Sequence, residues 1–246
     1  MALYELPTNL KKHSLCPGCG HGIILRLIAE TIEELGLQDK KILVLGVGCS
    51  CNANGILGGD DFQCAHGRAS AVATGMKLYL ESQGKDVCII TYQGDGDAGV
   101  IGLAETLNAA YRNENITVFT INNSNFAMTG GQMSWTTLAG QKTTTSVNGR
   151  DCAYTGNPIH LPEMIASQFD VAYAARASVC DVKHITQAKK FIKKAIQNQM
   201  DKKGYSIVEF LSQCPTNWGM APVDAAKYVA EKMTVEYPVG EFKVKE

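Results

Sequence analysis

Segments with strand character alternate with segments of helical character along most of this chain, and this alternation restricts the fold more than any other feature. The strands expected from β-rich or apolar runs are residues 41–47, 87–92, 116–121, 171–175 and 205–211. The helices expected from apolar spacing are residues 21–35, 68–81, 100–112, 161–168 and 184–199. Such alternation predicts an α/β fold with a mostly parallel sheet and helices on both faces. Because no internal repeat or linker interrupts the pattern, we expect one domain over residues 1–246.

Three other segments carry predictions of their own. Residues 125–157 form a polar stretch, rich in Gly and Thr, that is longer than ordinary connections and is therefore a candidate functional loop. The tail from residue 222 is expected to form a short helix followed by a charged, mobile end. Lysines crowd around residues 183–203, which predicts either a solvated helix face or a docking surface for an acidic protein.

The composition excludes several classes of protein. The chain has 246 residues and a net charge of −1, which gives no reason to expect a nucleic-acid partner or binding to a membrane surface. No apolar run is long enough to span a bilayer, and the N-terminus lacks the layout of a signal peptide. We therefore expect a cytoplasmic protein, in which nine cysteines are better suited to metal or cluster binding than to disulfides.

Two of the expected strands end in polar residues that suit a magnesium site. The run over residues 87–92 leads into Gly94, Asp95 and Gly96, and the run over residues 116–121 leads into Asn122 and Asn123. In a parallel sheet these ends meet at the edge where ligands bind. Asp95 and Asn123 would offer oxygen ligands to Mg²⁺, while the glycines leave backbone N–H groups open to an anion. This pair of strand ends resembles the diphosphate-binding motif of thiamine diphosphate enzymes.

Several cysteines have the spacing of a metal or cluster site. Cys16 and Cys19 stand three residues apart before the first helix, Cys49 ends the first strand, and Cys214 follows the strand over residues 205–211. Four thiolates suit zinc or a 4Fe–4S cluster, and spacing alone leaves Cys51 as a competitor for the third position. Unrelated buried thiols are the alternative to a metal or cluster site. Cys16 and Cys19 would also suit a redox dithiol, but thioredoxin-like proteins place that motif after a strand, and here it comes first.

Together the two motifs resemble the β subunit of 2-oxoacid:ferredoxin oxidoreductases over most of the chain. The matching stretches are residues 16–21, 46–50, 66–68, 73–78, 94–97, 129–134 and 214–217. The resemblance implies that Cys16, Cys19, Cys49 and Cys214 hold one 4Fe–4S cluster, with Cys49 preferred to Cys51. It also implies that the main-chain carbonyl of Asn125 joins Asp95 and Asn123 around Mg²⁺.

The resemblance further implies which residues contact thiamine diphosphate. We expect these to be Ser50, His66, Gly94, Asp95, Gly96, Asp97, Asn123, Asn125, Thr129, Gly130, Gly131 and Gln132. His66 is expected to supply a proton or a hydrogen bond in the reaction, although a lone histidine is more often structural. Arg68 is expected either to hold a substrate carboxylate or to pair with an acidic side chain.

The implied reaction is oxidative decarboxylation of a 2-oxoacid with coenzyme A, giving acyl-CoA, CO₂ and reduced ferredoxin. A separate α subunit would supply the domain that holds the aminopyrimidine ring, and a ferredoxin or ferredoxin-like subunit would accept the electrons. We slightly prefer 3-methyl-2-oxobutanoate as substrate over 2-oxoglutarate. The alternatives are a non-oxidative decarboxylase subunit and a non-catalytic electron-transfer module. Iron–sulfur absorbance would exclude the non-oxidative decarboxylase subunit. Binding of thiamine diphosphate would exclude the non-catalytic electron-transfer module.

Overall fold

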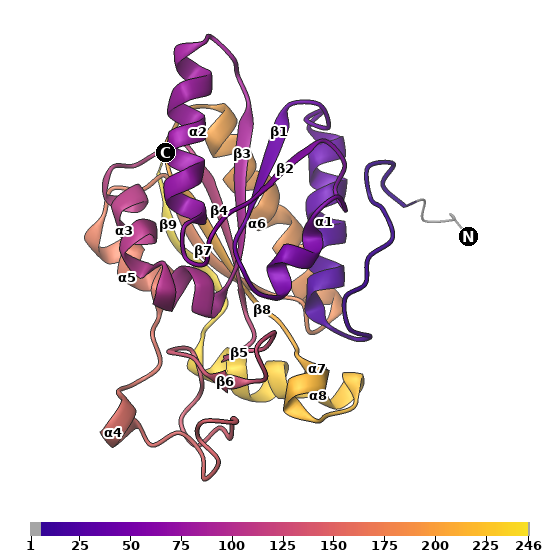
Figure 1. Ribbon diagram of the computed structural model, residues 1–246, viewed down its shortest axis with the longest axis vertical. Coiled ribbons are helices and arrows are strands. Elements are labelled where there is room, and N and C mark those ends of the chain that lie inside the picture. The colour runs from indigo at the N-terminus through magenta and orange to yellow at the C-terminus, as the bar shows by residue number, and fades with distance from the viewer. Residues whose placement is uncertain (1–5, 246) are drawn as a thin grey trace.

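The computed structural model describes residues 6–245 and contains one large sheet of seven strands (Figure 1). The strand order is β2-β1-β3-β4-β8-β7-β9, and every neighbouring pair is parallel except β7 and β9. The strands are β1 (Lys41–Leu45), β2 (Asp60–Gln63), β3 (Cys88–Gly94), β4 (Thr117–Asn122), β7 (Tyr173–Ser178), β8 (Ser206–Leu211) and β9 (Gly240–Val244). The predicted α/β architecture is therefore confirmed.

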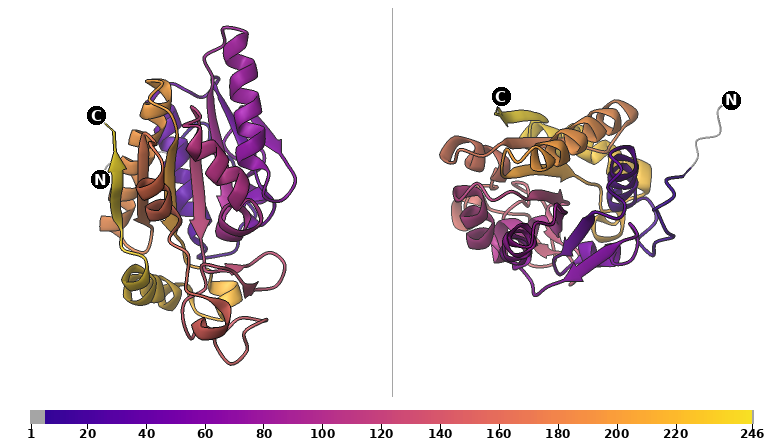
Figure 2. Two further views of the ribbon diagram at one scale, coloured as in Figure 1. Left: turned by 90° about the vertical axis from the view of Figure 1, so that its left-hand side faces the viewer. Right: turned by 90° about the horizontal axis from the view of Figure 1, so that it is seen from above.

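Helices cover both faces of the sheet, as the view from above in Figure 2 shows. One face carries α1 (Gly20–Glu34) and α6 (Val182–Met200), and the other carries α2 (Ala69–Ser82), α3 (Leu103–Tyr111) and α5 (Leu161–Gln168). Side chains alternate between the two cores along each strand, since Ile90 packs with the α1 and α6 layer while Ile89 packs with the α2 and α3 layer. Burial on both faces explains why the central strands are continuous apolar runs.

The sequence prediction was wrong about the C-terminal end. It expected a mobile charged tail, but residues 240–244 form β9, which pairs antiparallel with β7 at the edge of the sheet. Charged side chains in and just after this strand are paired: Oε1 of Glu241 lies 2.8 Å from Nζ of Lys194, and Nζ of Lys245 lies 2.7 Å from Oδ2 of Asp170. An edge strand needs only one apolar face, so its polar composition does not distinguish it from a loop. The same reason explains why β2 was not predicted.

The helical part of the tail is also longer than expected. It runs through α8 (Pro222–Tyr228), the π-helical turn η3 (Val229–Met233) and α9 (Thr234–Glu236). Its apolar side packs on a small core that includes Leu138, Leu211 and Met233. This packing holds the tail beneath the carboxyl ends of the strands, at the lower end of the molecule in Figure 1.

The long polar segment over residues 125–157 is ordered by its own hydrogen bonds. It contains the short hairpin of β5 (Asn125–Phe126) and β6 (Gln132–Met133) and the single helical turn α4 (Cys152–Thr155). Arg150 is nearly fully buried and donates to the carbonyl oxygens of Trp135 at 3.0 Å and Gly156 at 2.9 Å. The segment therefore forms a folded lobe next to the carboxyl edge of the sheet.

None of the helices within residues 6–245 is long and apolar enough to cross a membrane.

Candidate functional site

The carboxyl ends of β1, β3 and β4 bring most of the predicted site residues around one small cavity. These strands are parallel neighbours, with Leu45 opposite Tyr92 and Gly94 opposite Ile121. The cavity has a volume of about 70 Å³. Nine predicted residues line it, namely Ser50, His66, Gly94, Asp95, Gly96, Asp97, Asn123, Asn125 and Thr129. The parallel register therefore collects residues from widely separated parts of the sequence.

Three oxygen atoms converge at the ends of β3 and β4. The side-chain oxygen of Asn123 lies 2.8 Å from the carbonyl oxygen of Asn125 and 3.2 Å from Oδ1 of Asp95. Three acceptors this close repel one another unless a cation lies among them or the Asn123 amide turns to donate its N–H groups. The donor set, one carboxylate, one carboxamide and one carbonyl, is the oxygen set that Mg²⁺ prefers. The residues present therefore fit a magnesium ion.

Asp95 is buried, and its charge is poorly compensated by protein groups alone. Its side chain is 4% exposed and accepts a hydrogen bond from the hydroxyl of Thr136. Burial raises the pKa of Asp95 to about 7, although the hydrogen bonds act in the opposite direction. A divalent cation beside the carboxylate would remove this penalty. The buried side-chain oxygen of Asn125 also lacks a hydrogen-bond partner among residues 6–245.

Asp97 holds His66 in place. One carboxylate oxygen of Asp97 accepts a hydrogen bond from the backbone N–H of Gly67 at 2.7 Å and also contacts Nδ1 of His66. The other oxygen accepts from Nε2 of Gln93 at 2.6 Å. With Nδ1 engaged by a carboxylate, Nε2 is the nitrogen of His66 left for a ligand. Asp97, predicted as a cofactor contact, lines the cavity, and its hydrogen bonds position the histidine.

Gly96 of the motif lies so close to a neighbouring ring that a side chain would not fit. A Cβ atom on Gly96 would overlap the ring of Phe126, which also lines the cavity. The chain then enters a single π-helical turn, η2 (Asp97–Ile101), where the sequence predicted the start of an α-helix near residue 100. Such turns recur at functional sites because they re-aim backbone groups.

The predicted loop over residues 129–132 is only partly at the cavity. Thr129 lines it, whereas Gly130, Gly131 and Gln132 are not among its lining residues. The hydroxyl of Thr129 donates to Oε1 of Gln132 at 2.7 Å, so these two side chains bond to each other. Gly131 lines a larger groove of about 750 Å³ between the polar lobe and the C-terminal helices.

The four predicted cluster cysteines come together beside the same cavity. Cys49 lines it directly. The nearby thiol of Cys214 raises the pKa of both Cys19 and Cys49, and Cys19 also raises the pKa of Cys49. Burial and these neighbours raise the pKa of Cys19 to about 11 and that of Cys49 to about 12. Cys16 is the exposed member and is coupled to the other three. Without a metal the buried thiols hold their protons, and a metal is needed to stabilise the thiolates.

The four sulfur atoms are neighbours without forming a compact group. Within residues 6–245, no three of them lie within 4.8 Å of one another. Thiolates around a single tetrahedral zinc ion would lie about 3.8 Å apart, given a Zn–S distance of about 2.3 Å. Cys51 lies near Cys49 and is half-buried, but no contact within the described residues distinguishes it as a ligand.

Sequence reasoning missed a buried pair next to the cysteines. Nδ1 of His21 lies 2.7 Å from the hydroxyl of Tyr92, and His21 lines the cavity. Burial lowers the pKa of His21 to about 4, so its imidazole is neutral at physiological pH. His21 stands in the matched stretch over residues 16–21, but an aromatic residue within an apolar strand gives no sign of such a partner.

Arg68 lies away from the cavity lining. Its Nη1 is 2.7 Å from Oε1 of Glu105, so Arg68 pairs with an acidic side chain, the second of the two roles expected for it. Three lysines of the basic zone are also paired: Lys189 contacts Glu30 and Glu34 at 2.7 and 2.8 Å, and Lys193 and Lys194 contact Glu34 and Glu241. Much of the positive charge on that helix is therefore compensated.

Comparison with known proteins places this geometry in a family. Residues 46–210 match the model described as thiamine pyrophosphate enzyme, C-terminal TPP binding domain. The 2-oxoglutarate synthase subunit KorB of Methanocaldococcus jannaschii is 37% identical over 94% of this chain and 82% of its own length. The chain belongs to the 2-oxoacid:ferredoxin oxidoreductase family.

Another relative in the 2-oxoacid:ferredoxin oxidoreductase family is more similar in sequence. The ketoisovalerate oxidoreductase subunit VorA of Methanothermobacter thermautotrophicus is 43% identical over 93% of this chain, which corresponds to 47% of the relative. The chain thus spans about half the length of the first curated relatives it matches.

Solved structures share the fold. The 2-oxoglutarate:ferredoxin oxidoreductase from Magnetococcus marinus superposes with a TM-score of 0.77 at 25% identity, over 99% of this chain and 86% of that chain. Benzoylformate decarboxylase from Polynucleobacter necessarius, at 14% identity and a TM-score of 0.52, shares the fold over 83% of this chain and 35% of that chain.

Proposed function

We propose that this chain is the thiamine diphosphate-binding β subunit of a 2-oxoacid:ferredoxin oxidoreductase. With a partner α subunit, it would convert a 2-oxoacid and coenzyme A into acyl-CoA and CO₂ and pass the electrons to ferredoxin. We propose that residues 1–246 act as one domain in the cytoplasm. The observation that carries this proposal is that Cys49 lines the same cavity as Asp95 and Asn123. An electron-accepting centre and a diphosphate site would then be neighbours within one chain.

The magnesium ion and the diphosphate would be held at the ends of β3 and β4. Asp95, Asn123 and the carbonyl oxygen of Asn125 form the oxygen set for Mg²⁺. Ser50, Gly94, Gly96 and Thr129 line the rest of the cavity and would contact the cofactor. The loop residues Gly130, Gly131 and Gln132 would support Thr129. When bound, thiamine diphosphate supplies the stabilisation of negative charge on carbon that lets a 2-oxoacid lose CO₂.

His66 is the residue of this chain best placed to handle a proton. Its side chain is 33% exposed, whereas its partner Asp97 is 1% exposed, so the pair has a buried end and an open end. Asp97 fixes the ring orientation and leaves Nε2 of His66 to donate or accept at the cavity. His66 would therefore contact the reacting groups, while Asp97 acts as a positioning residue.

Cys16, Cys19, Cys49 and Cys214 would hold a 4Fe–4S cluster. Cys16 lies near enough to the other three thiols to raise their pKa, yet no three of these sulfur atoms, all within the described part of the chain, lie within 4.8 Å of one another. Thiolates on one zinc ion would lie about 3.8 Å apart, so this arrangement supports the larger iron–sulfur cube over zinc.

A partner α subunit is needed because the cavity is incomplete. Its volume of about 70 Å³ is far below the roughly 300 Å³ or more that cofactor-sized pockets enclose. Relatives named as oxidoreductase subunits, some about twice as long as this chain, support a site completed by further protein. We propose that the α subunit covers the open side of the cavity and binds the aminopyrimidine ring.

For the substrate we keep 3-methyl-2-oxobutanoate ahead of 2-oxoglutarate. The relative named ketoisovalerate oxidoreductase is 43% identical and that named 2-oxoglutarate synthase is 37% identical, which supports this order. Docking of ferredoxin on the basic zone has weaker support, since Lys189, Lys193 and Lys194 are paired with acidic side chains.

A test starts from the complex of this chain and its α subunit, purified without oxygen. Iron and sulfide are quantified, and reduction of a viologen dye is measured with a panel of 2-oxoacids and coenzyme A. We expect about four irons per β chain and turnover that requires Mg²⁺ and thiamine diphosphate. Iron-free complex, or dye reduction that does not need thiamine diphosphate, would contradict the proposal.

A further inference from the structure

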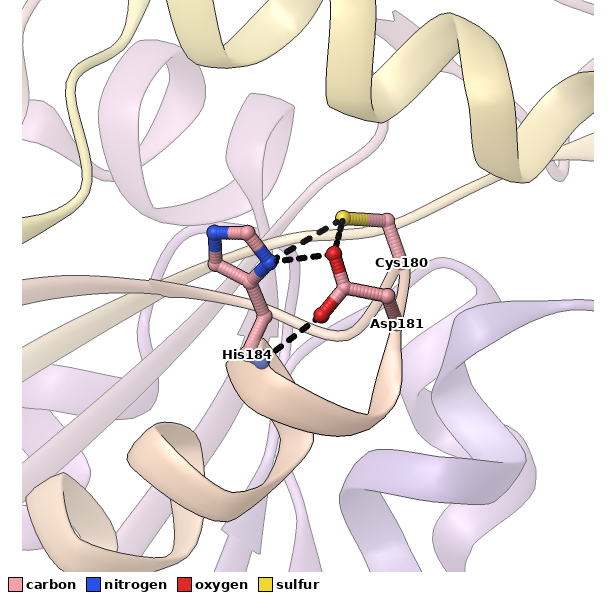
Figure 3. Close-up of side chains that lie close together, drawn as sticks. All are labelled: Cys180, Asp181 and His184. Atoms are coloured by element: carbon pink, nitrogen blue, oxygen red, sulfur yellow. Dashed lines mark hydrogen bonds and ion pairs between the residues drawn. The ribbon is translucent and has the colours of Figure 1, made fainter.

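A second group of metal-ligating side chains lies at the start of α6, separate from the cysteines described above. Figure 3 shows Cys180, Asp181 and His184 turned toward one another. Sγ of Cys180 is 3.7 Å from Nδ1 of His184 and 3.8 Å from Oδ2 of Asp181. Nδ1 of His184 is 2.7 Å from Oδ2 of Asp181. Among residues 6–245 this is the one group in which three such ligand atoms lie within 4.8 Å of each other.

The geometry of this group differs from that of a catalytic triad. In a catalytic triad, the nucleophile and the acid contact different nitrogens of the histidine. Here the thiol and the carboxylate both approach Nδ1 of His184. Three ligand atoms around one point suit a metal ion at their centre and cannot form a proton relay.

The distances are close to those of a tetrahedral site. Zn–S of about 2.3 Å and Zn–N of about 2.1 Å place tetrahedral S and N ligands about 3.6 Å apart. The observed separation of 3.7 Å between Cys180 and His184 matches this value. The separation of 2.7 Å between Asp181 and His184 would have to widen by roughly 0.7 Å, since tetrahedral N and O ligands lie about 3.4 Å apart.

The surrounding structure positions these three residues and leaves one ligand atom of each facing the other two. Cys180 is half-buried and packs against the small apolar core under the C-terminal helices, so the thiol has a fixed position. The two oxygens of Asp181 have separate tasks: Oδ1 caps α6 by accepting from the N–H of His184 at 2.9 Å, and Oδ2 faces the other ligands.

We propose that Cys180, Asp181 and His184 form a site for a borderline divalent metal of the zinc class. Thiolate and imidazole together favour such ions over Mg²⁺ or Ca²⁺. The site leaves a fourth position for water or a ligand from a partner, because Asp181 is exposed. Binding would tie the end of β7 to the first turn of α6. This proposal is independent of the thiamine chemistry.

The test uses the α–β complex with its iron–sulfur cysteines already loaded, so that they cannot take up added metal. Cobalt is titrated as a probe for zinc, and the thiolate-to-cobalt charge-transfer band and the visible bands of four-coordinate cobalt are recorded. We expect one equivalent to bind, with displacement by zinc. Cys180→Ser should abolish the charge-transfer band, and His184→Gln should weaken binding at least tenfold.

Two further variants control the result. Asp181→Asn keeps a capping oxygen for α6 and should weaken cobalt binding without unfolding the helix. Cys152→Ser removes a half-buried cysteine elsewhere and should bind cobalt like the unchanged chain. Equal cobalt binding by all variants, no charge-transfer band, or binding of several weak equivalents as an adventitious ion only would each overturn the proposal.

Discussion

Replacing Asp95 by asparagine should stabilise the metal-free chain while abolishing its use of magnesium. Asp95 is buried, and its pKa of about 7 compares with an ordinary value of 3.8. At about 1.4 kcal/mol per pKa unit, the difference means that ionising Asp95 destabilises the folded chain by about 4 kcal/mol. Asparagine keeps an acceptor for Thr136 and carries no charge. We expect Asp95→Asn to raise the free energy of unfolding by about 2 to 4 kcal/mol at pH 8.

The pH dependence gives the sign of this effect. Between pH 4 and pH 7 the folded chain holds the Asp95 proton more tightly than the unfolded chain does, so the unchanged protein loses stability as the pH rises. The advantage of Asp95→Asn should therefore shrink below about 2 kcal/mol at pH 5 and vanish near pH 4. Denaturant unfolding with a chelator at several pH values measures the difference in free energy of unfolding between the two proteins.

A matched variant and a ligand arm make the test decisive. Asp97→Asn alters an equally buried carboxylate that is held by three donors and should destabilise the chain at pH 8. In the α–β complex, Mg²⁺ with thiamine diphosphate should raise the unfolding midpoint of the unchanged protein but not that of Asp95→Asn. If Asp95→Asn were destabilised at pH 8, or shifted equally at all pH values, the reasoning about the buried charge would be refuted.

Three further predictions concern the same edge of the sheet. Cys49→Ser should lose the iron–sulfur absorbance of the complex, whereas Cys51→Ser should keep it; equal loss in both would show that Cys51 is a ligand. Gly96→Ala should cost about 1 to 3 kcal/mol in denaturant unfolding, because its Cβ overlaps Phe126, and Phe126→Leu should restore part of that loss. Asp97→Asn should lower turnover by roughly 10²-fold while thiamine diphosphate affinity, measured by calorimetry, changes only a few-fold; a parallel loss of affinity would mean that Asp97 holds the cofactor itself.

Much of the fold and the core of the site follow from the sequence because parallel strands leave clear signals. Central strands buried on both faces are apolar runs, and their carboxyl ends fall at one edge. That rule was enough to predict that Asp95 and Asn123 lie together, although they are 28 positions apart in the sequence. The edge strands β2 and β9 were missed because each has an uncovered side and carries charged residues.

The rest of the site depends on contacts that no local pattern encodes. Asp97 and His66 are 31 residues apart, and His21 and Tyr92 are 71 apart. Nothing in the sequence next to any of these residues indicates its partner. The preference for Cys49 over Cys51 likewise came from the family resemblance, since both cysteines are half-buried at the same turn.

The most direct test of the account is electron paramagnetic resonance of the α–β complex frozen shortly after a 2-oxoacid is added. If the thiamine site and the cluster share one cavity through Cys49, a reduced 4Fe–4S signal should appear within the first turnover and only with Mg²⁺ and thiamine diphosphate. Asp95→Asn complex should keep the cluster, as shown by chemical reduction, yet give no signal with substrate. A cluster that substrate reduces equally well in Asp95→Asn, or a β chain that carries no iron, would contradict the account.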